Sequence, residues 1–254
     1  MLYFKNKTVQ NFRLKSLFFC IFLGLFQPIF SQNKKKDYLV TIHTKFGNMN
    51  LVLFDKTPKH KANFLKLVND KFYDSTLFHR VIQNFMIQGG DPNSKKAKAG
   101  EVLGGGDIGY KIPAEFSPEL YHKKGALAAA GNNFPATESS GCQFYIVHGK
   151  VWDEPGLEAQ IKRSGRPFTD SQKVTYKTIG GSPHLDGNYT VFGQLIGGFT
   201  VLDSIANSKT SKSPKDRPLA DLKMNISVQK LKKKKILKKY ADKSVIQKYD
   251  DLNI

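Results

Sequence analysis

The stretch that decides the fold lies at residues 78–91 and reads FHRVIQNFMIQGGD. Two runs of β-branched, aromatic and other apolar residues flank the polar pair QN in its centre, a pattern typical of two strands around a tight loop. If the loop has three residues, Asn84 takes a position that tolerates a positive φ. The stretch therefore predicts a β-hairpin.

The register of this hairpin determines which side chains meet. With a three-residue loop, Arg80 lies opposite Gln88 and Ile82 opposite Met86, so that a fixed cation, an amide and two apolar groups share one sheet face. With a two-residue loop, Arg80 would instead lie opposite Ile87. The sequence alone does not choose between the two registers.

Outward from this hairpin, short alternating apolar segments continue with no βαβ alternation. A Thr-Pro pair before an apolar helical period predicts a helix over residues 58–69. We expect a mainly β fold, a closed eight-stranded antiparallel β-barrel capped by two helices. Further strands are expected at 38–44, 50–54, 125–130, 143–148, 190–195 and 224–228, and a second helix at 200–206.

Three segments fall outside this pattern. Residues 91–109 form a long Gly- and Lys-rich loop, and such loops in compact domains are often functional. The polar stretch 149–183, with helical pieces near 156–164, reads as an insertion between two strands. Residues 230–254 form a Lys-rich extension with the apolar period of an amphipathic terminal helix.

The N-terminus has the layout of a secretory signal peptide. Four basic residues and no acidic one precede the apolar run 17–30, and Ser31 is followed by a hydrophilic stretch. We expect cleavage near Ser31 and export to the periplasm or cell envelope, with 1–31 as signal peptide and 32–229 as the main domain. The alternative is a protein anchored in the membrane by residues 17–30.

The net charge of +19 lies unevenly along the chain, since residues 209–254 carry 14 basic and 5 acidic residues. A basic tail favours contact with an anionic surface, and the alternative is a solvated lysine-rich helix. The six histidines show no ligand spacing, so neither a metal nor another cofactor is expected. Cys142 is expected to be an inert buried thiol.

The 78–91 stretch closely resembles the signature of the cyclophilin-type peptidyl-prolyl cis–trans isomerases. The resemblance continues, in the order of that family, through three further segments that together span residues 38–228. They are GALAAA at 125–130, SSGCQFYI at 139–146 and LDGNYTVFG at 185–193.

The resemblance implies that Arg80 is the catalytic residue. Rotation about an X–Pro bond breaks no bond, and a permanently charged guanidinium near the prolyl nitrogen would stabilise the single-bonded transition state. The implied substrate contacts are Phe85, Met86, Gln88, Ala130, Gly131, Gln143, Tyr145, Leu185 and Tyr189.

Two positions depart from the pattern of many eukaryotic members. His184 stands where they carry tryptophan, and Tyr189 stands where they carry histidine. Neither is the implied catalytic cation, so we expect isomerase activity to survive. The missing indole leads us to expect weak cyclosporin binding.

The resemblance therefore implies an isomerase that acts on X–Pro bonds of exported proteins during folding. The alternative is a cyclophilin-like module that binds proline-containing segments, with catalysis incidental. We expect a monomer with no specific nucleic-acid partner. Because Leu185 directly follows the insertion 149–183, we hypothesise that the insertion forms one rim of the substrate pocket; the alternative is a decorative surface loop.

Overall fold

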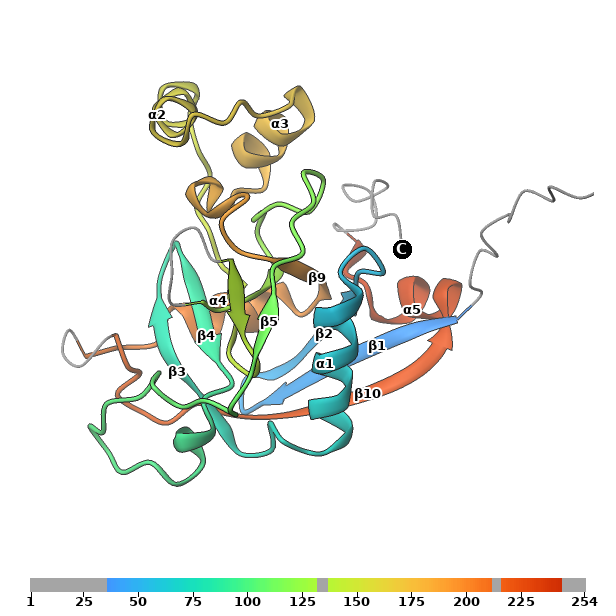
Figure 1. Cartoon of the computed structure of the whole chain (residues 1–254), viewed down its shortest axis with the longest axis vertical. Helices are drawn as coiled ribbons and strands as arrows, with labels where there is room; N and C mark the ends of the chain where they lie inside the picture. The colour runs from blue at the N-terminus through green and yellow to red at the C-terminus, as the bar shows by residue number, and fades with distance from the viewer. Residues whose placement is uncertain (1–35, 132–136, 212–215, 244–254) are drawn as a thin grey trace, which may run out of the picture. The chain divides into compact units, whose positions relative to one another are not determined.

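Eight strands of the chain close into an antiparallel barrel (Figure 1). The computed structural model describes residues 36–131, 137–211 and 216–243. The strands are β1 (Lys36–Thr44), β2 (Gly47–Leu53), β3 (Thr76–Ile82), β4 (Met86–Gly89), β5 (Lys111–Pro113), β6 (Ala126–Ala129), β7 (Glu138–Ser140), β8 (Phe144–Val147), β9 (Val191–Gly197) and β10 (Lys223–Lys232). The barrel has the order β1-β10-β3-β4-β8-β6-β9-β2, and a separate two-stranded sheet joins β5 and β7. The expected eight-stranded barrel is thus confirmed.

The two expected helices both pack against the barrel. Helix α1 spans Pro58–Asn69, begins with proline at its first turn and buries Phe64, Leu67 and Val68. Helix α4 spans Phe199–Ala206 and contacts β2, β3 and β4. Both helices bury a stripe of apolar side chains, which is why the 3.6-residue period located them.

Buried side chains on the two faces of a barrel strand belong to two different apolar clusters. On β6, Leu127 and Ala129 belong to the main core, which also holds Phe64, Tyr73 and Phe144 in edge-on ring contacts. The alternate residues of β6 point into a second cluster with Tyr145, Met86 and Leu185. This second cluster lies under the candidate site described below, so the period-two alternation of β6 connects the core to the site.

The insertion forms two helices, α2 (Glu154–Ser164) and α3 (Asp170–Thr178), at the top of Figure 1. The side chain of Asp153 caps α2, and Thr169 with Gln172 forms a capping box at the start of α3. Leu157, Phe168 and Tyr176 make a small core of their own. The helical piece expected near 156–164 corresponds to α2, whereas α3 was not expected.

The C-terminal region continues the barrel beyond the boundary expected at Lys230. Strand β10 runs to Lys232, and Lys230 pairs with Tyr38 of β1. The basic helix α5 (Lys233–Tyr240) follows, and its Ile236 is buried against Leu39 and Ile196. The start of the expected extension is therefore part of the folded unit, because its apolar residue has a place on the outer face of β1 and β9.

Two expectations fall on other parts of the chain. The signal peptide at 1–31 and the end of the extension, 244–254, lie outside the described residues. Within 36–131, 137–211 and 216–243, no helix combines the length and apolar character needed to cross a bilayer.

Candidate functional site

The β3–β4 hairpin adopts the three-residue loop. Arg80 pairs with Gln88 and Ile82 with Met86, and Asn84 has a φ of 61°. The Phe85 N–H donates to the Ile82 carbonyl at 3.1 Å, which closes the turn. Asparagine tolerates this left-handed conformation better than most residues, so the turn residue and the register support each other.

A β-bulge at His79 precedes Arg80. Phe78 pairs with Gly89 and Arg80 with Gln88, so β3 has one residue more than β4 between these pairs. His79 is 3% exposed, and neither of its ring nitrogens has a hydrogen-bond partner among the described residues. Burial lowers its pKa to about 4, so the ring is neutral at physiological pH. The bulge strengthens the local twist of the strand beside the arginine.

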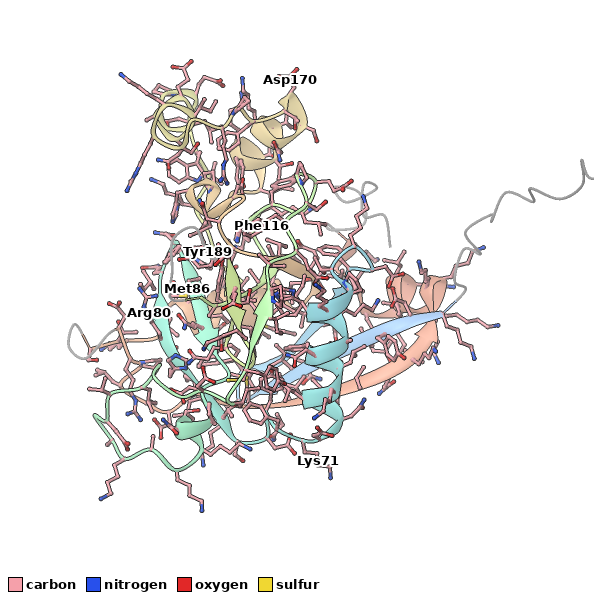
Figure 2. All side chains as sticks on the ribbon, in the orientation of Figure 1. Lys71, Arg80, Met86, Phe116, Asp170 and Tyr189 are labelled. Carbon is pink, nitrogen blue, oxygen red and sulfur yellow. The ribbon has the colours of Figure 1, made fainter. Side chains whose placement is uncertain are left out.

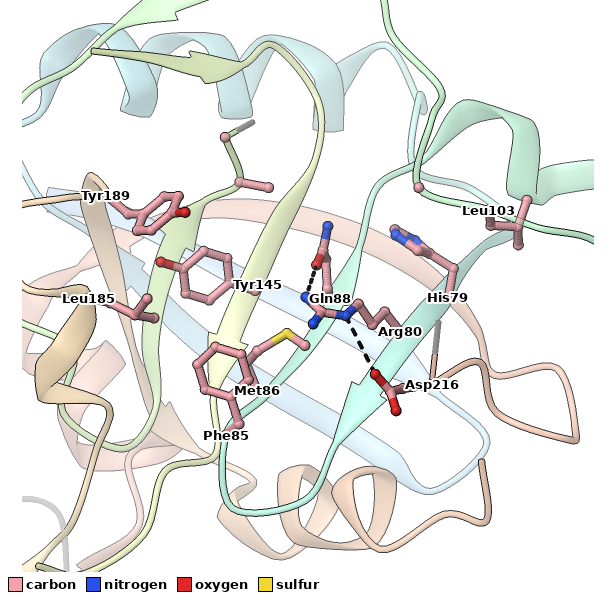
Figure 3. Close-up of a pocket in the computed structure, with 13 residues that line it drawn as sticks. His79, Arg80, Phe85, Met86, Gln88, Leu103, Tyr145, Leu185, Tyr189 and Asp216 are labelled. Atoms are coloured by element: carbon pink, nitrogen blue, oxygen red, sulfur yellow. Dashed lines mark hydrogen bonds and ion pairs between the residues drawn. The ribbon is translucent and has the colours of Figure 1, made fainter. Parts of the chain in front are cut away.

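A cavity of about 440 Å³ opens on this face of the barrel. Nine of the ten predicted site residues line it: Arg80, Phe85, Met86, Gln88, Ala130, Gly131, Tyr145, Leu185 and Tyr189. Figure 3 shows one group of apolar and aromatic side chains on one side of this cavity and Arg80 on the other; the group consists of Phe85, Met86, Tyr145, Leu185 and Tyr189. We call this cavity the proline pocket, because its apolar half matches the pocket that the resemblance implies.

The guanidinium of Arg80 lies between an amide and a carboxylate. Its Nη1 donates a long hydrogen bond of 3.5 Å to Gln88 Oε1, and its Nε lies 3.9 Å from Asp216 Oδ2. The Arg80 side chain is 37% exposed. Neither contact is short enough to occupy the cation fully, so it can still donate to a group in the pocket.

Gln143 lies outside the pocket lining, behind Gln88. Its Nε2 donates to the carbonyls of Gly104 at 3.1 Å and Gly106 at 2.9 Å, and its Oε1 accepts from Gln88 Nε2 at 3.2 Å. The side chain is buried, and both its NH2 group and its oxygen form hydrogen bonds with protein groups. Gln143 therefore orients Gln88 and fixes the loop around Gly104, and its own amide does not face the cavity.

A chain of buried hydrogen bonds joins the insertion to the proline pocket. The Tyr176 hydroxyl donates to Asp186 Oδ2 at 2.6 Å, and the other oxygen of Asp186 lies 2.9 Å from His122 Nδ1. The opposite ring nitrogen of His122 lies 2.9 Å from the Tyr145 hydroxyl. Burial raises the pKa of Tyr145 well above its usual value, so the hydroxyl keeps its proton. The wall of the pocket is thus tied to α3.

Four lining residues were not predicted: His79, Leu103, Gly104 and Asp216. Gly104 reaches the pocket because its N–H donates to the buried carboxylate of Asp91, the last residue of the deciding stretch. Long loops such as 91–109 are often functional, but the sequence does not show the contact that brings this loop to the pocket. Asp216 is 136 residues beyond Arg80 in the chain, and no local pattern pairs them.

Among the described residues we find neither a metal-ligand cluster nor an activated thiol. Among them, no three histidine, cysteine, aspartate or glutamate side chains gather as metal ligands. Burial raises the pKa of the Cys142 thiol to about 11, so it is not a nucleophile at neutral pH. The arrangement suits a reaction that needs an apolar socket and a directed positive charge.

Comparison with known proteins gives a consistent result. The family model for cyclophilin type peptidyl-prolyl cis-trans isomerase/CLD matches residues 39–228. A putative peptidyl-prolyl cis-trans isomerase of Staphylococcus aureus is 39% identical over 186 residues, covering 72% of this chain and 87% of that protein. A putative bifunctional phosphatase/peptidyl-prolyl cis-trans isomerase of Streptococcus pyogenes is 44% identical over 188 residues, and the chain spans 37% of its length.

Solved structures agree with the sequence relatives. A Cryptosporidium parvum cyclophilin type peptidyl-prolyl cis-trans isomerase superimposes with a TM-score of 0.55 at 28% identity, covering 76% of this chain and 98% of that one. A second structure of that protein, determined in the presence of the dipeptide Ala-Pro, gives a TM-score of 0.54.

Proposed function

The chain belongs to the cyclophilin-type peptidyl-prolyl cis–trans isomerase family, and from that membership we propose that its proline pocket rotates X–Pro bonds in exported polypeptides. The uncatalysed barrier to this rotation is about 18–20 kcal/mol. No bond is made or broken, so catalysis consists of stabilising the twisted amide more than the planar one.

Each side of the pocket has a part in this mechanism. Phe85, Met86 and Leu185 hold the pyrrolidine ring by apolar contact. As the amide twists, the lone pair of the prolyl nitrogen is no longer delocalised, and Arg80 donates to it. The Gln88 amide, oriented by Gln143, binds the backbone of the substrate next to the proline. The observation that carries the proposal is the partly exposed Arg80 guanidinium facing this apolar socket.

The test is cis-to-trans exchange of a short X–Pro peptide with the full chain. We expect Arg80→Ala to lower kcat/KM by about 100-fold or more, as removal of a single directed donor does elsewhere. Arg163→Ala, at an exposed position on α2, is the matched control and should keep wild-type activity. A folded wild-type protein that binds the peptide without accelerating exchange would favour the binding module instead.

Export is the second part of the proposal. It is supported by the basic residues before the apolar run 17–30 and by the small residue Ser31 at its end. N-terminal sequencing of the protein isolated from the native cell envelope tests it. A mature chain that begins near residue 32 is the expected result, and a chain that retains 17–30 in the membrane fraction supports the anchored alternative.

We also propose that the lysines at the end of β10 and beyond it contact an anionic surface. The described part of this region, from Lys230 to Lys243, carries eight lysines and one acidic residue. Binding to vesicles with and without anionic lipid tests this contact. Retention that disappears at high salt is expected, because surface charges are screened within about 10 Å at 0.1 M salt; equal binding to neutral vesicles would contradict it.

A further inference from the structure

A second cavity, of about 330 Å³, lies between the insertion and the barrel. We call it the insertion groove and define it by Phe116, Leu120, Pro167, Phe168, Tyr189 and Val191. Tyr189 also lines the proline pocket, so the two cavities share this side chain. Figure 2 shows Phe116 and Tyr189 in the region between the insertion helices and the barrel.

The groove is held open by contacts between its two walls. Gln172 of α3 donates from Nε2 to the Pro118 carbonyl at 3.0 Å, and the Tyr121 hydroxyl donates to Thr175 Oγ1 at 3.0 Å. Arg166 donates from Nη1 to the Asp186 carbonyl. Because side chains of the insertion anchor to the barrel side at three points, the groove exists before any ligand arrives.

The floor of the groove exposes a large apolar side chain. Phe116 is 46% exposed, although the residue before it is fixed: Glu115 accepts from the backbone N–H groups of Lys59 and His60 at the start of α1. A phenylalanine held at the surface beside a preformed cavity offers contact area to a ligand at little conformational cost.

We propose that the insertion groove is a second subsite for the same polypeptide, and that it takes a large apolar side chain of a residue near the isomerised proline. The inference rests on the proposed isomerase function. Continuity with the proline pocket through Tyr189 identifies the occupant as the substrate chain rather than a separate ligand. An extended chain advances about 3.3 Å per residue, so a residue two to four positions from the proline reaches across one tyrosine ring.

The proposal assigns a role to the insertion. Short substrates that fill only the proline pocket should be bound weakly and without selection. Longer substrates with a correctly spaced apolar residue should gain affinity, since burial of such a side chain is favourable even after the chain has been ordered.

The experiment uses equal-length peptides with one proline in an Ala, Gly and Ser background. Each peptide carries one phenylalanine two, three or four residues before or after the proline, and a reference peptide carries none. Calorimetry measures Kd, and cis–trans exchange measures kcat/KM for the full chain. At one or more positions, phenylalanine should tighten binding by about tenfold relative to the reference peptide.

Substitutions of Phe116 test whether the gain in affinity arises in the insertion groove. Phe116→Ser should abolish it while leaving the Phe-free reference peptide unaffected, and Phe116→Leu should retain a large part of it. The matched control is Phe46→Ser, a phenylalanine 41% exposed in the turn between β1 and β2, which should change nothing.

Two results would overturn the inference: no phenylalanine position that tightens binding, or a gain that survives Phe116→Ser. Both are distinct from a failure of the isomerase proposal, in which the Phe-free reference peptide itself would not be isomerised by the wild type.

Discussion

His122 Nε2 lies 2.9 Å from the hydroxyl of Tyr145, and the His122 ring is completely buried. The carboxylate of Asp186 accepts from Nδ1 on the other side of the ring. In the neutral ring Nε2 is then the acceptor, and the tyrosine donates to it. The tyrosine in the wall of the proline pocket is therefore fixed by a partner outside the pocket.

Tyr145→Phe removes the hydroxyl that donates to His122 and leaves the buried Nε2 of His122 without this hydrogen bond. The free energy of unfolding should fall by about 1–3 kcal/mol, while kcat/KM on a short peptide changes little because the aromatic wall remains. Urea unfolding and peptide exchange measure the two effects. The control is Tyr110→Phe, which loses an exposed hydrogen bond to Asn63 and should cost less than about 0.5 kcal/mol. Equal costs in the two variants would contradict the prediction.

His79 should make stability depend on pH. Its folded-state pKa of about 4 lies below the unfolded value of 6.5, and burial is the main cause. Between these values the unfolded chain binds a proton that the native protein does not, so stability falls as the pH drops from about 6.5 to about 4, by roughly 3 kcal/mol.

Urea unfolding at pH 7 and pH 4.5 measures this dependence, and His79→Leu should flatten it. Part of the pH dependence of the free energy of unfolding will remain, since burial also lowers the pKa of His60 and His148. Parallel curves for the wild type and the variant would show that His79 is not the source.

Gln143→Glu tests the orienting role of this amide. The variant keeps the size of the side chain but loses both donors to the Gly104 and Gly106 carbonyls and places a carboxylate against them. We expect kcat/KM to fall by about tenfold, equivalent to about 1.4 kcal/mol, with the loss largely in KM because repulsion from the two carbonyls displaces the side chain that orients Gln88. Gln229→Glu, at an exposed position on β10, is the control. An unchanged KM would argue against the orienting role.

Asp216→Asn should have a small effect. The ion pair with Arg80 is long, at 3.9 Å, and both side chains are more than a third exposed. Exposed pairs of this kind contribute about 0.2–1 kcal/mol, so kcat/KM should change by no more than about fivefold. A loss as large as that of Arg80→Ala would instead make Asp216 essential for placing the guanidinium.

Cyclosporin should bind weakly, because His184 lacks the indole donor and ring surface that the family resemblance associates with this ligand. The His184 ring packs against Phe85, which lines the proline pocket, with 5.3 Å between the two ring centroids. Calorimetry should give a Kd above 1 µM, and His184→Trp should tighten binding. A sub-micromolar Kd for the wild type would refute the prediction.

The barrel was predictable where local patterns were strong. The asparagine and the apolar runs on either side of it located the hairpin but left two registers open, and the structure has the one that pairs Arg80 with Gln88. Helix α1 has the predicted bounds because Pro58 fixes its start and its buried residues keep a clear helical period.

Other features depend on contacts that no local pattern contains. Gln143 matches the family motif in sequence. Its side-chain NH2 group, however, donates to the carbonyls of Gly104 and Gly106, in a loop almost forty residues earlier in the chain. Asp216 and Leu103 reach the pocket from distant loops. Helix α3 is mostly polar outside its buried Tyr176, so its apolar period is weak. Its capping box and its side-chain contacts to Pro118 and Tyr121 hold it in place instead.

The pairing of β1 with β10 has a consequence for the order in which the protein folds. Lys36 of β1 pairs with Lys232 of β10, roughly two hundred residues later in the chain. Such a high contact order makes closure slow, because a long loop must be ordered before the two strands meet. During synthesis the barrel cannot close until Lys223–Lys232 has left the ribosome, and until then β1 and β3 each lack one neighbour. A chain shortened before Lys223 would keep those two edges open and would be prone to aggregation and proteolysis.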